Sequence, residues 1–109
     1  MRIEVITTIS PAALWTKIKK DITDENIKTW SVVKNNANNE YLTHNPPQWI
    51  DKALIKPTFE TKPERLILTI TWWKGKVPTE YIKGFYVGRF TEVLLEHYRS
   101  DYNKLETFA

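Results

Sequence analysis

The sequence contains no cysteine among its 109 residues. Without thiols the chain forms no disulfide, binds no metal through thiolates and offers no cysteine nucleophile. Long hydrophobic runs are also missing, so we expect no segment that spans a bilayer. Residues 1–9 alternate instead of forming an apolar block, which argues against a signal peptide. These features predict a soluble, cytoplasmic protein with no membrane partner.

Recognisable catalytic motifs are scarce too. The chain has no glycine-rich phosphate loop, no Ser/His/Asp arrangement in a familiar context and no acidic metal cluster. We therefore predict a non-enzymatic domain, with no catalytic residue, cofactor or metal. An enzyme that uses Glu92 or Glu96 as a general base stays open, because the environment of a carboxylate can raise its pKa.

The histidine and aspartate residues near the C-terminus are too few to form a metal site. His97 and Asp101 are four residues apart and would share a face of a predicted helix. Zinc normally takes three or four protein ligands, and His44 could join the pair only through folding. We expect an exposed histidine–carboxylate pair.

Net charge is small, at +3 from 16 basic and 13 acidic residues. Residues 31–78 contain seven basic and four acidic side chains, so the whole excess lies in this middle segment. Such an excess favours an anionic partner weakly. Ordinary solubilising charge is the alternative.

The first third of the chain predicts a strand and then helices. Residues 1–9 alternate as a half-buried strand does. Ser10 followed by Pro11 predicts the start of a helix that ends near Lys20. Thr23, followed by two acidic residues, predicts a second cap and a short helix to about Lys28.

The middle of the chain predicts antiparallel strands. The segments "TWSVVK" and "EYLTH" flank "NNANN", whose asparagines suit a tight turn. "WIDKALIKPTFET" predicts a strand with a break at Pro57, and "KPER" turns the chain into "RLILTITWW".

Thr79 then caps a long helix that we expect to reach about Leu105. The order of elements predicts a single α+β domain over residues 1–109. It has an antiparallel sheet of about five strands, with an N-terminal helix and a long C-terminal helix packed on one face.

Two adjacent tryptophans end the strongest strand pattern. Leu66, Leu68 and Ile70 alternate with mixed residues, so Trp72 is predicted in the core and Trp73 on the opposite face. A cavity, a second copy of the chain in a homodimer, or a nucleobase stacked near Lys74 and Lys76 would each cover Trp73. The alternative is that Trp73 lies sideways on a neighbouring strand.

Two glycines lie within the last predicted helix. Glycine costs about 1 kcal/mol relative to alanine in a helix, so Gly84 and Gly88 need a reason. Close approach of the helix to the sheet is the expected reason, and a bend in the helix or an opening beneath it is the alternative.

Three segments, "ISPAALWTKI", "DITDENIKTW" and "TKPERLILTITW", give the chain a family resemblance. They resemble pieces of the helix-grip fold of the START and Bet v1-like superfamily. The resemblance implies a small binding or interaction domain that holds an apolar ligand or a protein partner between the sheet and the last helix. The expected lining residues are Trp30, Trp72, Tyr86 and Phe90.

Nucleic-acid binding is the alternative function. Trp73 and Tyr41 would stack on bases, and lysines would contact phosphates. The candidate lysines are Lys52, Lys56, Lys74 and Lys76.

Overall fold

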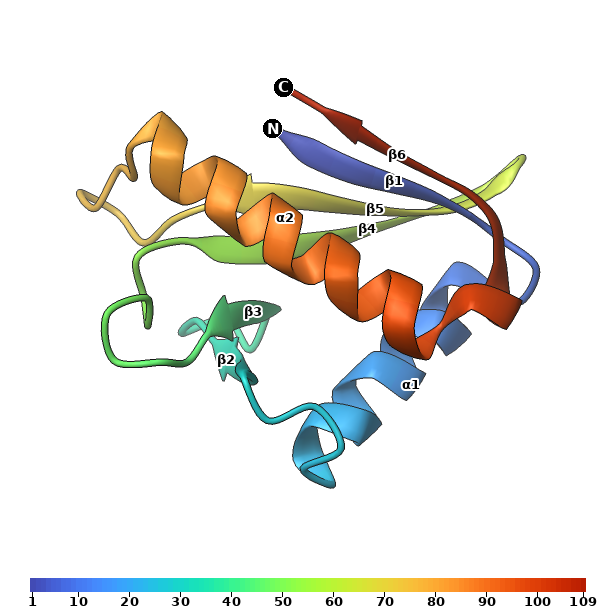
Figure 1. The fold of residues 1–109 in the computed structure, drawn as a ribbon, viewed down its shortest axis with the longest axis horizontal. Helices are drawn as coiled ribbons and strands as arrows, with labels where there is room; N and C mark the ends of the chain where they lie inside the picture. Colours follow the sequence, from blue (N-terminus) through green and yellow to red (C-terminus); the bar gives the residue numbers. More distant parts are fainter.

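The computed structural model describes residues 1–109 as a six-stranded antiparallel sheet with two helices on one face (Figure 1). The elements are β1 (Arg2–Thr7), α1 (Pro11–Thr23), β2 (Trp30–Lys34), β3 (Glu40–His44), β4 (Leu54–Thr61), β5 (Glu64–Thr71), α2 (Glu80–His97), a 3-10 turn (Arg99–Asp101) and β6 (Tyr102–Phe108). The strand order is β2-β3-β4-β5-β1-β6. The predicted α+β class is confirmed, with one strand more than expected.

The core lies between the helices and one face of the sheet. Ile3 of β1 pairs with Leu68 of β5, and Val5 pairs with Leu66, so alternate residues of both strands point toward the helices. All four side chains are fully buried. They join a single cluster of 20 buried residues that includes the apolar stripes of α1 and α2. Neither helix combines the length and apolarity that crossing a bilayer requires.

Both predicted helix starts are confirmed, whereas the predicted second short helix is wrong. Ser10 Oγ accepts the Ala13 N–H at 3.0 Å, and the Thr79 hydroxyl caps α2 in the same way. Beyond Thr23 the chain makes a turn, with Glu25 in the left-handed region at φ 63°. The backbone carbonyl of Asp21 accepts the N–H groups of residues 26 and 27, which closes α1.

The long helix ends at His97, so its predicted extension to about Leu105 is wrong. Tyr98 leaves the helical conformation at φ −128° and ψ 16°. Its hydroxyl donates to Asp21 Oδ2 at 2.6 Å, which ties the end of α2 to α1. The chain then turns through residues 99–101 and returns as β6, which pairs antiparallel with β1 at the edge of the sheet (Figure 1). A strand therefore follows the long helix.

The predicted break at Pro57 is also wrong, because β4 runs unbroken from Leu54 to Thr61. Pro57 pairs with Leu68 of β5. Pairing between β3 and β4 occurs only at Leu42 and Ile55, so β4 has one neighbour at Pro57. Proline is tolerated there because its missing N–H would have no strand to meet.

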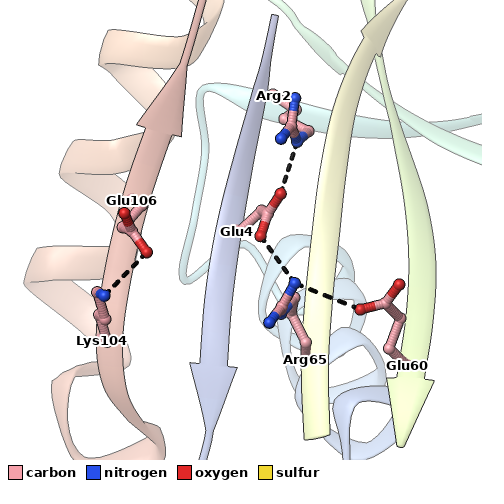
Figure 2. Close-up of polar contacts among 6 residues, drawn as sticks. All are labelled: Arg2, Glu4, Glu60, Arg65, Lys104 and Glu106. Carbon is pink, nitrogen blue, oxygen red and sulfur yellow. Dashed lines mark hydrogen bonds and ion pairs between the residues drawn. The ribbon is translucent and has the colours of Figure 1, made fainter. Parts of the chain in front are cut away.

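The sheet face that points away from the helices, here called the open face, has no helix over it. Figure 2 shows a chain of charges across three strands: the Arg2 guanidinium lies 2.6 Å from Glu4, and Arg65 contacts both Glu4 and Glu60. These four side chains of alternating charge therefore keep the open face polar. The Ile and Thr side chains on the same face are partly exposed.

The glycines of α2 do not allow a close approach to the sheet, so that prediction is wrong. Gly84 and Gly88 are both exposed, and a Cβ on either would meet no atom within 4 Å. Their helix face points to solvent.

Alanine at these positions is therefore expected to stabilise the fold. Gly88→Ala should raise the free energy of unfolding by about 0.5–1 kcal/mol, because it removes backbone freedom from the unfolded chain without a clash. Urea melts of Gly88→Ala and Gly84→Ala would measure this. A loss of stability in either variant would mean that the glycine face contacts something.

Candidate functional site

The space beneath α2 is filled with aromatic side chains. Trp30 is 2% exposed, and Tyr86 and Phe90 are fully buried. The Trp30 ring meets Tyr86 and Phe90 edge to face, with centroid distances of 5.5 and 5.1 Å. This packing is that of a core and leaves no chamber between the sheet and the helix. A ligand would have to enter from the surface.

A surface groove opens beside this packed layer, between α2, the ends of β2 and β3, and the loop 45–53. We call it the α2 groove. Its volume is about 390 Å³. The lining residues are Thr29, Trp30, His44, Pro46, Gln48, Trp49, Phe85, Arg89, Glu92, Val93 and Glu96. This size suits a small molecule, and the lining mixes aromatic rings with charged and polar groups.

Two stacked rings form one wall of the groove. Trp49, from the loop, lies parallel to Phe85 of α2, with 3.7 Å between centroids and 10° between planes. The loop is held to the helix because the Tyr86 hydroxyl donates to the Trp49 carbonyl. Tyr81, one turn earlier on α2, extends the aromatic surface outward and is largely exposed. The wall is therefore built by tertiary contacts between distant segments.

His44 lies at the inner side of the groove. The residue is 6% exposed, and its ring lies 4.7 Å from the Trp30 ring. Its Nδ1 atom is buried and has no hydrogen-bond partner. Burial lowers the pKa of the imidazole below its usual value; the nearby Thr29 backbone opposes this, and the charge of Arg89 lowers the pKa further. His44 is therefore neutral near pH 7.

Charged side chains of α2 stand at the mouth of the groove. The Arg89 guanidinium lies 3.1 Å from Glu92 Oε2 and 5.1 Å from the Phe85 ring centroid. Glu96 is 3.8 Å from the His97 ring nitrogen. Two carboxylates and one guanidinium line the groove, so its mouth has a net negative charge that favours neutral or cationic ligands.

The residues expected to line a ligand site are not all in one place. Trp30 lines the α2 groove, whereas Tyr86 and Phe90 are buried behind it. Trp72 is 36% exposed, so its predicted place in the core is wrong. Its strand ends at Thr71, and the tryptophan ring has the Lys83 ammonium 5.0 Å from its centroid.

Trp73 adopts the sideways arrangement that the sequence left open. Its indole Nε1 donates to Asp51 Oδ1 at 3.2 Å, and its ring meets Tyr41 of β3 edge to face at 5.7 Å. Lys74 and Lys76 are exposed in the turn around Gly75 and do not line the α2 groove. The surface predicted around Trp73 is therefore separate from the groove.

The proposed pairings of acidic and histidine residues are only partly realised. Glu92 and Glu96 both line the groove. His97 and Asp101 do not share a helix face, because α2 ends at His97 and Asp101 pairs with Lys17 at 2.6 Å. No group of three or more His, Cys, Asp or Glu side chains is placed to hold a metal ion.

Sequence reasoning missed most of the groove. It did not single out Trp49, Phe85 or Arg89, and it weighed His44 only as a distant metal ligand. One signal was available: once the turn "NNANN" is accepted as a hairpin, His44 lies directly across from Trp30. Trp49 follows two prolines in a loop, where no periodicity predicts which way its ring points.

Comparison of the chain with protein-family models, with curated proteins and with solved structures gives no match. The function is therefore argued from the groove and its chemistry.

Strand alternation alone predicts that truncating Trp72 destabilises the protein more than truncating Trp73. The structure predicts the reverse. Trp73→Ala removes an edge-to-face pair worth about 0.5–1.5 kcal/mol and a hydrogen bond worth about 1 kcal/mol. We expect it to lower the free energy of unfolding more than Trp72→Ala does. Denaturant melts of both variants, with Trp73→Phe to isolate the indole N–H, would measure the difference. A larger loss in Trp72→Ala would place Trp72 in the core.

Stability should fall in mild acid because of His44. In the unfolded chain His44 has a pKa of about 6.5, and in the folded state its pKa is lower. As the pH drops through this range, the unfolded state binds more protons, so the free energy of unfolding decreases. Urea midpoints should be lower at about pH 5.5 than at about pH 7.5.

The chain offers a matched control, since it has only two histidines. His44→Gln should lose much of this pH dependence, and His97→Gln should keep it. The same slope in His44→Gln as in the parent protein would contradict a buried, neutral His44.

Proposed function

We propose that this protein is a small binding domain whose ligand occupies the α2 groove. The observation that carries the proposal is His44, a nearly buried imidazole in the groove lining whose Nδ1 has no partner. Leaving a buried polar atom unpaired costs about 1–3 kcal/mol, so such atoms are rare without a use. Nδ1 has no solvent-exposed surface, so a ligand with a polar edge would supply the missing hydrogen bond after displacing a lining side chain.

The groove lining supports a planar ligand with a neutral or positively charged edge. The Trp49–Phe85 pair offers an aromatic wall, and the neutral His44 can donate or accept one hydrogen bond. Glu92 and Glu96 favour a cation over an anion at the mouth. This ligand is more polar than the apolar molecule expected from the sequence, because no enclosed apolar chamber exists beneath α2.

The helix-grip resemblance remains part of the proposal. An antiparallel sheet with a long helix packed across it supports a relationship of architecture. The groove lies beside the long helix and not beneath it, and β6 follows that helix. Under this proposal the helix serves as one wall of an open site.

Three probes of the same shape test the proposal: benzamidine, benzamide and benzoate, which are cationic, neutral and anionic. Backbone amide spectra of the labelled protein should show saturable shifts at Gln48, Trp49 and Phe85 with the first two. For ligands of this size we expect dissociation constants of about 1 mM. Benzoate should bind at least several-fold more weakly than benzamidine.

Variants locate the binding. His44→Gln should weaken benzamide at least several-fold, and Glu92→Gln with Glu96→Gln should weaken benzamidine more than benzamide. Arg99→Gln is the matched control, because Arg99 is exposed and lies outside the groove. No saturable shift in the groove, or shifts confined to Trp73 and its neighbours, would contradict the proposed site.

A further inference from the structure

The strand β6 forms one edge of the sheet, with β1 on one side and no strand on the other (Figure 1). Such an edge presents a row of unpaired backbone groups that can pair with another strand. The other edge, β2, is shorter, with five residues against seven, and α1 packs on it. The two edges are therefore not equivalent.

The register fixes which groups of β6 face outward. The Met1 carbonyl accepts the Ile70 N–H, so odd-numbered residues of β1 bond to β5. Even-numbered residues then bond to β6, where Glu4 lies opposite Glu106 and Ile6 opposite Lys104. Leu105 and Thr107 consequently point their N–H and C=O groups away from the sheet, whereas Asn103 lies at a bulge where the pairing with β1 shifts by one residue.

These outward groups suit a two-fold axis through Leu105. In an antiparallel pair of β6 strands centred there, Leu105 meets its own copy, in a pair of the kind that exchanges two hydrogen bonds. Thr107 lies opposite the bulged Asn103 of the other chain. The outward N–H and C=O groups of Leu105 would therefore find partners in both chains.

Charge selects this register over its neighbours. Lys104 and Glu106 flank Leu105 and lie on the open face (Figure 2). With the axis at Leu105, each lysine faces a glutamate of the other chain. A shift of the axis to residue 104 sets lysine against lysine, and a shift to 106 sets glutamate against glutamate. Opposite charges directly across a strand pair stabilise it, and like charges destabilise it.

Apolar contact adds to this match. Leu105 packs against the core from the helix side of the sheet and is only partly buried. Leu105 of the second copy would cover the part of this side chain that is still exposed. A lone lysine on an edge opposes strand pairing, but lysine and glutamate placed symmetrically about an apolar residue favour pairing with an identical edge.

We propose that two copies of this chain pair through β6, antiparallel and centred on Leu105, to form a continuous twelve-stranded sheet. The interface is small, so the dimer should dissociate on dilution. Sedimentation velocity between about 10 μM and 1 mM should show a monomer–dimer equilibrium. A monomer throughout this range would overturn the proposal.

Charge variants test the register. Lys104→Glu and Glu106→Lys should each be monomeric, because each sets like charges against each other across the axis. Glu106→Lys loses an exposed 3.1 Å ion pair with Lys104 but also removes a carboxylate that lies opposite Glu4, so the fold should lose little stability. Thermal melts of both variants would verify that they remain folded.

Mixing the two variants is the decisive step. An equimolar mixture of Lys104→Glu and Glu106→Lys should form heterodimers, since each new glutamate faces a new lysine. No effect within one chain predicts this recovery. A mixture that stays monomeric, or single variants that dimerise as well as the parent protein does, would overturn the register.

A backbone variant tests the edge itself. Thr107→Pro removes an N–H that faces away from β1, so the fold should survive while the dimer is lost. Dimerisation that persists in Thr107→Pro would show that another surface forms the contact.

Discussion

The hydrogen bond from Tyr98 to Asp21 is the constraint on which the arrangement of this molecule depends. It joins residues 77 positions apart, at the end of α2 and near the end of α1. The bond holds the pKa of the Asp21 carboxyl below its usual range, and burial raises the pKa of the Tyr98 phenol. The phenol therefore stays protonated and the carboxylate charged at neutral pH, which is the strong form of this hydrogen bond.

Two parts of the structure follow from this anchor. Because Tyr98 is buried at the end of α2, the helix stops there, and the next residues turn back toward the sheet. The Thr8 N–H donates to the Asp101 carbonyl, which brings β6 beside β1. The same anchor holds the C-terminal end of α2, the end that carries Glu96 of the groove.

The sequence predicted those elements whose signals are local. The alternation of β1 and β5, the caps Ser10 and Thr79 and the "NNANN" turn all stand in the structure. It failed where tertiary contacts outweigh periodicity. Val87, Phe90 and Leu94 continue toward Tyr98 and Leu105 at helical steps, yet Asp21 captures Tyr98 and the later residues gain more from pairing with β1.

The candidate site was less predictable than the fold, for a related reason. Its walls come from segments far apart in sequence: Trp49 stacks on Phe85 only after Tyr86 has pinned the loop. For Trp72 the local pattern predicts the side of the sheet but not the burial. Alternation predicts the side of the sheet correctly, but β5 ends one residue earlier, and the Lys83 ammonium covers the ring in place of a packed core.

Sheet topology separates the groove from the β6 edge. The groove is built on β2 and β3, at one end of the strand order, and β6 is at the other end. Pairing through β6 would therefore leave both grooves of a dimer open, with no residue shared between the two surfaces. A ligand in the proposed site would contact α2 near Phe85 and Arg89, whereas the proposed contact between chains rests on Lys104, Leu105 and Glu106. Binding and association should accordingly be independent, unless the Tyr98 anchor that positions both α2 and β6 shifts when either surface is occupied.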